Sequence, residues 1–115
     1  MIHCKRVYEA PERGDGHRVL VDRLWPRGLK REKADLDEWL KDIAPSDELR
    51  HWFGHEPAKW PEFERRYHAE LSSPDMQAQL AHLRKLAKSK TVTLLYAARD
   101  EEHNNALVLK EVLEG

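Results

Sequence analysis

Charged side chains follow an uninterrupted apolar run near the start of this sequence, and their types could support acid–base chemistry and anion recognition. Asp22 and Arg23 come directly after Val19, Leu20 and Val21, a run that is typical of a strand covered on both faces. In open α/β sheets, ligands bind in the crevice beyond the carboxyl ends of the strands. We therefore expect a functional site where this strand ends.

A second group of polar side chains follows the other strongly apolar segment, residues 91–98. Arg99, Asp100 and His103 come after it. A long helical segment joins the two apolar runs, and a crossover of this kind makes the strands parallel and brings their ends to the same side of the sheet. The sequence therefore predicts one shared crevice. Its candidate residues are Asp22, Arg23, Trp25, Arg27, Tyr96, Arg99, His103 and Asn104.

The arginines of this set indicate what the crevice could bind. Arg23, Arg27 and Arg99 each carry a planar guanidinium group, which can hold a phosphate or a carboxylate through two parallel hydrogen bonds. Trp25 could offer a stacking surface to a base or a sugar. The residue types therefore favour a small anionic or nucleotide-like ligand.

Asp22 and His103 are the candidates for a catalytic acid and base, because a carboxylate can accept a proton and an imidazole titrates near neutral pH. Each has a structural alternative. Asp22 could pair with an arginine and simply close the end of the sheet, and His103 could be an exposed residue at a helix start. Asp100 is expected to cap that helix. Tyr96 and Asn104 complete the ligand-binding candidates.

The elements that position these residues follow the order strand, strand, helices, strand, helix, which is an α/β pattern. Strands are expected over residues 2–8, 18–24 and 91–98, and helix signals mark the segments 35–43, 46–54, 60–71, 73–90 and the C-terminal residues. We expect a small, at least partly parallel sheet of about three strands, flanked by helices in a single domain over residues 1–115. The polar segment 9–16 is too short for a crossover helix, which favours an antiparallel first strand.

Composition narrows the function classes. The 115 residues suit one domain, and the formal net charge of −1 provides no whole-molecule attraction to nucleic acid or membranes. The single cysteine, Cys4, excludes an intramolecular disulfide and favours the cytoplasm, and we expect it to be a buried residue rather than a nucleophile. No apolar run approaches the ~20 residues that span a bilayer. Basic blocks within 1–34 and 76–90 would create a local positive field if they converged.

The sequence has no glycine-rich phosphate loop and no serine nucleophile elbow, and we expect no cofactor. His51 and His55 have the four-residue spacing of a helical metal pair. Gly54 between them is expected to end the helix, and no matching third ligand is evident, so no metal is expected either.

Two other function classes stay open. The basic connector, residues 23–33, mixes arginines and lysines with Trp25 and could contact nucleic acid, although the pI near 6.7 lacks the basic signature of a dedicated binder. A protein-interaction domain is the second alternative, and a dimer that buries Trp52 or Trp60 would be its sign.

Three separated segments carry a family resemblance: VLVDRLWPRG, PSDELRHWFGH and TLLYAARDEEHNNALVL. In this order, and with a match over nearly the whole chain, they resemble the YeaO-like branch of the domain-of-unknown-function 488 (DUF488) family. The resemblance implies a small cytoplasmic bacterial α/β protein with a parallel first strand. It implies no activity, so no catalytic residue can be transferred from the family.

Longer relatives in the broader family have an aspartate–arginine pair after the second strand, which stands here as Asp22 and Arg23. They also have two cysteine-containing patterns at the last strand and helix. Tyr96 takes the place of the first cysteine, and residues 103–105 stand in the region of the second pattern. The resemblance therefore speaks against a thiol or metal role in this chain.

These observations together predict a protein that binds a small anionic or nucleotide-like ligand, with or without turnover. We expect it to act as a monomer or homodimer and away from membranes.

Overall fold

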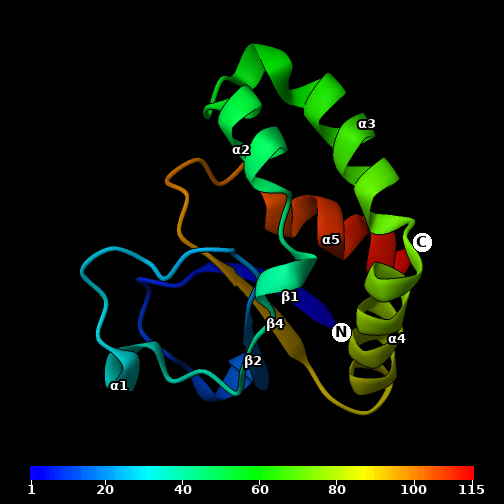
Figure 1. Ribbon diagram of the computed structural model, residues 1–115. Helices are drawn as coiled ribbons and strands as arrows, with labels where there is room; N and C mark the ends of the chain where they lie inside the picture. Colours follow the sequence, from blue (N-terminus) through cyan, green and yellow to red (C-terminus); the bar gives the residue numbers. More distant parts are fainter.

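The computed structural model describes residues 1–115 and contains one four-stranded sheet in which every strand pair is parallel (Figure 1). The strands lie in the order β1-β4-β2-β3. Their bounds are β1 Ile2–Arg6, β2 His17–Leu20, β3 Glu38–Trp39 and β4 Val92–Tyr96. The expected α/β class is confirmed, and the sheet has one strand more than the three expected.

The first strand is parallel to the second, so the antiparallel orientation favoured by the short connection is wrong. β4 lies between β1 and β2, and Val92 is the partner of both Ile2 and His17. The length expected of a parallel connection is that of a crossover which usually contains an α-helix. The connection from β1 to β2 contains only the short 3₁₀ helix Arg13–Asp15 and no α-helix, so it crosses β4 in fewer residues.

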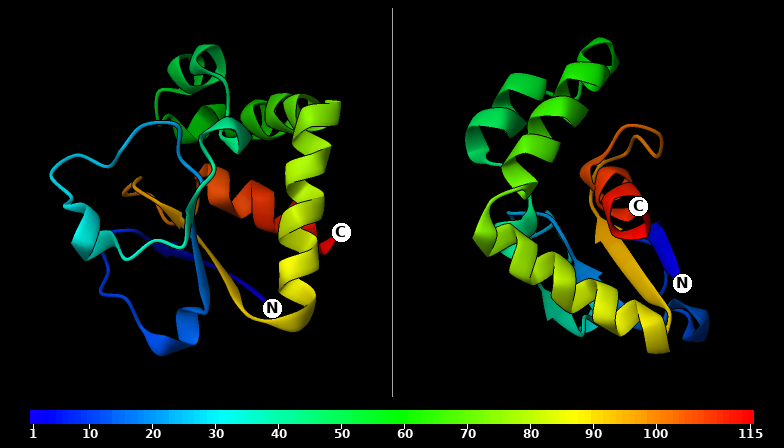
Figure 2. Two further views of the ribbon diagram at one scale, coloured as in Figure 1. Left: turned by 60° about the horizontal axis from the view of Figure 1, so that its bottom comes forward. Right: turned by 90° about the vertical axis from the view of Figure 1, so that its right-hand side faces the viewer.

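Four helices cover one face of the sheet (Figures 1 and 2). Their starts follow from the sequence: the Ser46 hydroxyl accepts the Leu49 N–H, and the Ser73 hydroxyl accepts the Met76 N–H, as N-cap residues do. Gly54 ends one of them in the left-handed conformation. The bounds are α2 Asp47–Phe53, α3 Trp60–Leu71, α4 Pro74–Ser89 and α5 Asn105–Glu114, with a short 3₁₀ helix at Pro57–Lys59 before α3.

The helix expected over 35–43 is not formed. Asp35 adopts a left-handed backbone, with φ of 48°, and ends the short helix α1, Arg31–Ala34, rather than starting a helix. β3 and the 3₁₀ helix Lys41–Ile43 follow. The helical spacing misled because the apolar residues of this segment pack on opposite faces of the sheet: Leu36 and Trp39 on one, Leu40 and Ile43 on the other.

The sheet separates two hydrophobic clusters, because successive strand side chains point to opposite faces. The larger cluster lies under α2–α5 and includes Val19 and Leu94. The smaller one lies on the other face, where α1 and the loops cover it and Trp25 and Trp39 pack against it. Its buried members are Val7, Leu20, Ala34 and Leu95.

The longest helix, α4, has 16 residues. No helix combines the length and the hydrophobicity that a passage through a lipid bilayer requires.

Candidate functional site

A cavity of about 370 Å³ lies at the carboxyl ends of β2 and β4. Four parts of the chain line it: the segment after β2, the residues around α2, Phe63 of α3, and the loop from β4 to the start of α5, with Tyr8 at its edge. Six of the eight candidate residues lie here. They are Asp22, Arg23, Trp25, Arg27, His103 and Asn104.

Asp22 joins the ends of β2 and β4. Its Oδ2 accepts the backbone N–H of Ala97 at 2.9 Å, and its carbonyl oxygen accepts the indole N–H of Trp39 at 2.7 Å. β2 is shorter than expected because the Asp22 side chain, rather than its backbone, bonds to the neighbouring strand end. Asp22 forms no ion pair within 4.0 Å, so the expected pairing with an arginine is wrong, but its side chain does close the end of the sheet, as that alternative proposed.

The carboxyl of Asp22 is electrostatically unusual. Burial raises its pKa above the usual range, and the Ala97 N–H, the Asn105 amide and the positive charges of His55 and Arg50 only partly offset this effect. A carboxyl whose pKa is raised by burial in a cavity is a common feature of functional sites.

Arg23 is held by backbone carbonyl groups rather than by carboxylates. Its Nε donates to Pro45 O and its Nη2 to Ala44 O, both at 3.2 Å, while Asp47 Oδ1 lies 3.9 Å from Nε. The contacts fix the guanidinium against the entry to α2 and leave its charge only weakly compensated. Arg23 therefore has both a structural role and a charge that a ligand could use.

Trp25 lines the cavity, but one of its faces is taken. The Cζ atom of Arg31 lies 4.6 Å from its ring centroid, and the ring meets Trp39 edge-on at 5.3 Å. Its indole N–H donates to Leu29 O at 2.7 Å. These contacts hold the segment 22–31 in place as one wall of the cavity.

His103 lies in the loop before α5 and is oriented by its neighbours. Its Nδ1 is 2.8 Å from Asp100 Oδ2, and its ring meets Trp60 edge-on at 5.3 Å. The N–H of Glu102 and the His103 side chain together lower the pKa of Asp100. A histidine whose one nitrogen is held by a carboxylate has its other nitrogen set for proton exchange.

Asp100 does not cap α5, so that expectation is wrong. Asn104 is the N-cap, and its side-chain oxygen accepts the Leu107 N–H at 3.1 Å. Asp100 instead closes a turn by accepting the N–H groups of Glu102 and His103. The helix starts later than the acidic run suggested, because the side chain that accepts an N–H group of its first turn is that of Asn104 and not that of Asp100.

Arg50 and His55 also line the cavity, and the sequence analysis did not name them. Arg50 stands three residues before Phe53 on α2, so it lies near the helix face that is buried. His55 has a positive φ of 58°, directly after the left-handed Gly54, which turns the chain back toward the cavity. The position of Arg50 relative to Phe53 was the one signal that could have identified it.

The floor of the cavity is apolar. Phe53 and Phe63 stack with ring centroids 4.5 Å apart, and both are buried in the main cluster. At the mouth, Leu24 is 58% exposed, and the hydroxyl of Tyr8 donates to Arg27 O at 2.8 Å. The aromatic floor was missed because Phe53 and Phe63 fit an ordinary core pattern.

Tyr96 and Arg99, the two other candidates, do not line the cavity. Tyr96 is buried in the main cluster, where burial raises its pKa. Arg99 is exposed. The structure therefore does not bring these two side chains to the other six.

Charge is unevenly distributed around the cavity. The lining includes three arginines and two histidines but a single carboxylate, that of Asp22. The described chain holds no group of three or more His, Cys, Asp or Glu side chains arranged for a metal ion. The arrangement suits an anion that also offers a hydrogen-bond donor.

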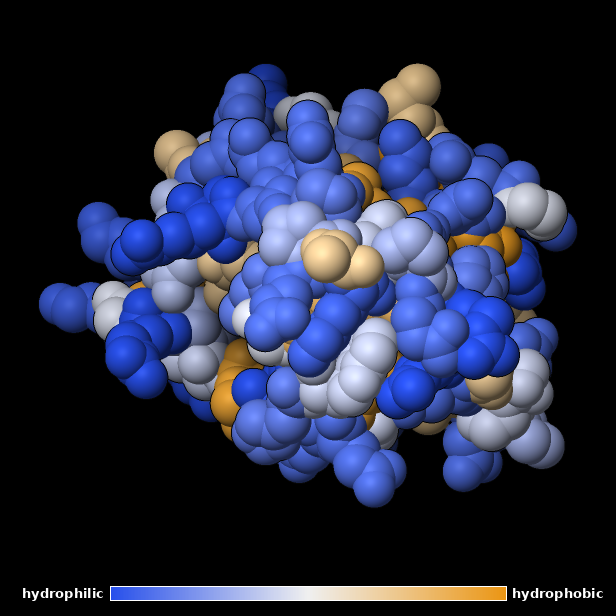
Figure 3. Space-filling model, turned by 90° about the horizontal axis from the view of Figure 1, so that it is seen from above, coloured by the Kyte–Doolittle hydropathy of each residue, from blue (hydrophilic) through white to orange (hydrophobic).

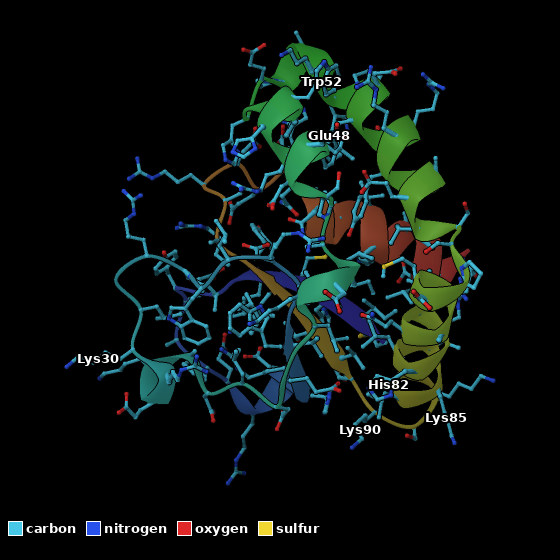
Figure 4. All side chains as sticks on the ribbon, in the orientation of Figure 1. Lys30, Glu48, Trp52, His82, Lys85 and Lys90 are labelled. Carbon is cyan, nitrogen blue, oxygen red and sulfur yellow. The ribbon has the colours of Figure 1, made fainter.

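Outside the cavity, Lys30 of the first basic block lies apart from the second block. Lys30 lies on the opposite side of the molecule from Lys85 and Lys90 (Figure 4). Cys4 packs against the main cluster, and its Sγ lies 3.4 Å from Ala106 O.

Comparisons with known proteins identify the family of this chain. Residues 1–115 match the DUF488-N3i family, described as the inactive DUF488-N3 subclade. The chain is 46% identical over 112 residues to the uncharacterized protein YeaO of Escherichia coli K12, covering 97% of this chain and 96% of YeaO. It is 43% identical over 114 residues to the uncharacterized protein Rv3073c of Mycobacterium tuberculosis, covering 99% and 94% of the two chains. No solved structure matches it. The chain therefore belongs to the DUF488 family, in the DUF488-N3 subclade described as inactive.

Proposed function

We propose that the cavity binds a small anionic or nucleotide-like molecule. The observation that carries this proposal is the surplus of cationic groups around it, among which the Nε of Arg50 is buried without a hydrogen-bond partner. Arg27 has no ion pair and its guanidinium makes no hydrogen bond within the chain. Because buried donors are normally satisfied, an anion in the cavity would supply the missing acceptor.

We further propose that the ligand is bound without turnover. The description of the subclade as inactive supports this reading. If the ligand were turned over, Asp22 and His103 would be the groups that exchange protons with it, since both line the cavity and His103 is oriented by Asp100. Formation of a product during prolonged incubation would overturn the binding-only proposal.

Binding of nucleic acid by the basic connector is less well supported. Arg31 stacks over Trp25 and lies 5.9 Å from the ring centroid of Trp39, so one face of the Trp25 ring that could receive a base is already used. We therefore place the small ligand ahead of an oligonucleotide.

A protein-interaction role also has less support. Trp52 is covered by Lys59 and Arg66, which lie 5.1 and 4.2 Å from its ring centroid, and Trp60 packs on Phe63. The face seen in Figure 3 is largely hydrophilic, with hydrophobic side chains scattered over it. An interface would be expected to show a larger apolar patch. We propose that the protein acts in the cytoplasm, because a chain with a single cysteine is typical of a reducing compartment.

Titration calorimetry with inorganic pyrophosphate at low ionic strength tests the anion site. We expect saturable binding that Arg50→Gln weakens about tenfold, the loss typical of one charged hydrogen bond. The matched control is Arg13→Gln, because Arg13 is exposed and has no side-chain hydrogen bond or ion pair. Equal weakening by both variants, or no binding by the native chain, would overturn the proposal.

A further inference from the structure

The cavity has two chemically different ends. The arginines come from the segment after β2 and from α2, whereas Asp22 places a carboxylate at the strand ends. In an extension that rests on the proposed function, we propose that Asp22 recognises the exocyclic amino group of the base in a nucleoside monophosphate. The phosphate of this nucleotide would lie among the arginines. Bases with an amino group would then bind more tightly than the matching bases with a carbonyl oxygen.

The carboxylate of Asp22 is fixed in advance. Its Oδ2 is occupied by the Ala97 N–H, and its backbone carbonyl by Trp39. The Asn105 amide donates to Val21 O at 2.9 Å, beside the same carboxyl. The same amide also favours the charged form of the Asp22 carboxyl. Each carboxylate oxygen can accept more than one hydrogen bond, so Oδ1 keeps the capacity to accept one from a molecule in the cavity. The existing contacts remove the need to order the side chain when that molecule binds.

The part of the cavity between the two ends suits a flat ring. Phe53 and Phe63 present a stacked aromatic floor, and Pro26 and Trp25 line the wall. The volume of about 370 Å³ lies near the lower end of the range of ~300–1,000 Å³ found for small-molecule sites. One mononucleotide fits this size better than a dinucleotide.

A carboxylate discriminates between donors and acceptors because, when ionised, it only accepts hydrogen bonds. An exocyclic amino group can donate to Asp22, whereas a ring carbonyl oxygen at the same position would face a second acceptor. A mismatched ligand binds much more weakly, because it leaves a buried polar group without a hydrogen-bond partner.

Asp22→Asn gives a sharper test than removal of the side chain. The Ala97 N–H requires an oxygen acceptor, so the amide oxygen would take the place of Oδ2 and the NH₂ group would face the cavity. The variant would then offer a donor where the native protein offers an acceptor, and the preference for the base would invert.

Two matched pairs serve as probes: cytidine against uridine monophosphate, and adenosine against inosine monophosphate. Calorimetry should show the amino-bearing member of each pair binding about tenfold more tightly to the native protein, with the order reversed in Asp22→Asn. Asp42→Asn is the control, because Asp42 is exposed and has no hydrogen bond or ion pair through its side chain. It should leave the order unchanged.

The outcomes separate the two proposals. If pyrophosphate binds and the nucleotides show no preference, or if Asp22→Asn binds both members alike, the role of Asp22 is wrong and the anion site stands. If neither pyrophosphate nor any nucleotide binds, the proposed function itself is wrong. A thermal melt of each variant shows that the comparison concerns folded protein.

Discussion

The side chain of Asp22 accepts the backbone N–H of Ala97 at 2.9 Å, and this single contact ties the ends of two neighbouring strands at the edge of the cavity. The same carboxyl is largely buried and has no cationic partner within 4.0 Å, so its ionisation reduces the free energy of unfolding.

The pKa of Asp22 therefore makes a prediction about stability. A carboxyl whose pKa is raised on folding contributes stability below its unfolded pKa and loses that contribution as the pH rises through the folded value. Asp22→Asn keeps an acceptor for Ala97 and removes the buried charge, so it should raise the urea midpoint at pH 7. The difference should shrink as the pH approaches about 3.9, the unfolded pKa of Asp. A lower midpoint at pH 7 would contradict this account.

The opposite sign is expected for Asp15, on the far face of the sheet. Its Oδ2 accepts Nη1 of Arg18 at 2.5 Å, and Arg18 is only 3% exposed. Burial opposes ionisation of Asp15, but hydrogen bonds from the Glu12 N–H, Lys5 and Arg18 outweigh it and lower the pKa. The stabilisation is therefore present above the unfolded pKa of about 4 and is lost as the pH falls through the lower folded value.

Asp15→Asn would leave the Arg18 charge without its buried partner and should reduce the free energy of unfolding by about 3 kcal/mol in urea titrations. Glu12→Gln is the control, since Glu12 pairs with Lys5 at 2.8 Å but is 72% exposed. Glu12→Gln should reduce the free energy of unfolding by less than about 1 kcal/mol. Similar losses in the two variants would mean that burial of the pair does not set its strength.

Gly16, directly before β2, lets the backbone approach Thr91 closely. It has φ of 63°, and a Cβ there would lie 2.3 Å from Thr91 O, the oxygen that accepts the His17 N–H. Gly16→Ala should therefore destabilise the fold by about 2–4 kcal/mol, measured by urea unfolding. Gly14→Ala meets nothing within 4 Å and should change stability by less than about 0.5 kcal/mol.

Cys4 should be a poor nucleophile in the folded protein. Burial raises its pKa to about 11, an effect that Lys110 only partly offsets. At pH 8 the thiolate fraction is then about 100-fold below that of a free cysteine. Alkylation by iodoacetamide, followed by mass spectrometry, should be slower by at least this factor in native protein than in urea. Equal rates would show that Cys4 is accessible and ionised.

Local signals predicted the helices around the cavity well. Ser46, Gly54 and Ser73 bound α2 and the start of α4 because capping depends on a few neighbouring residues. The apolar runs likewise located β2 and β4, and with them the edge of the sheet where six of the eight candidates lie.

The failures occurred where distant contacts decide the structure. Leu36 and Leu40 pack on different faces of the sheet. The spacing of apolar residues along the sequence does not show on which face each one packs. The insertion of β4 between β1 and β2 reversed the expected orientation of the first strand. Arg50 and the Phe53–Phe63 floor reach the cavity only because α2 and α3 fold back over the strand ends, which no single segment encodes.

The wall 22–31 is anchored to the sheet at Asp22 and through the contact of Trp25 with Trp39. Between these anchors, the packing of Arg31 on Trp25 and the hydrogen bond from Trp25 to Leu29 O hold it from within the segment. Replacement of exposed residues such as Leu24 and Arg27 could therefore retune which molecules are accepted while the scaffold stays intact. A protein built in this way can diversify its specificity through one short stretch of sequence.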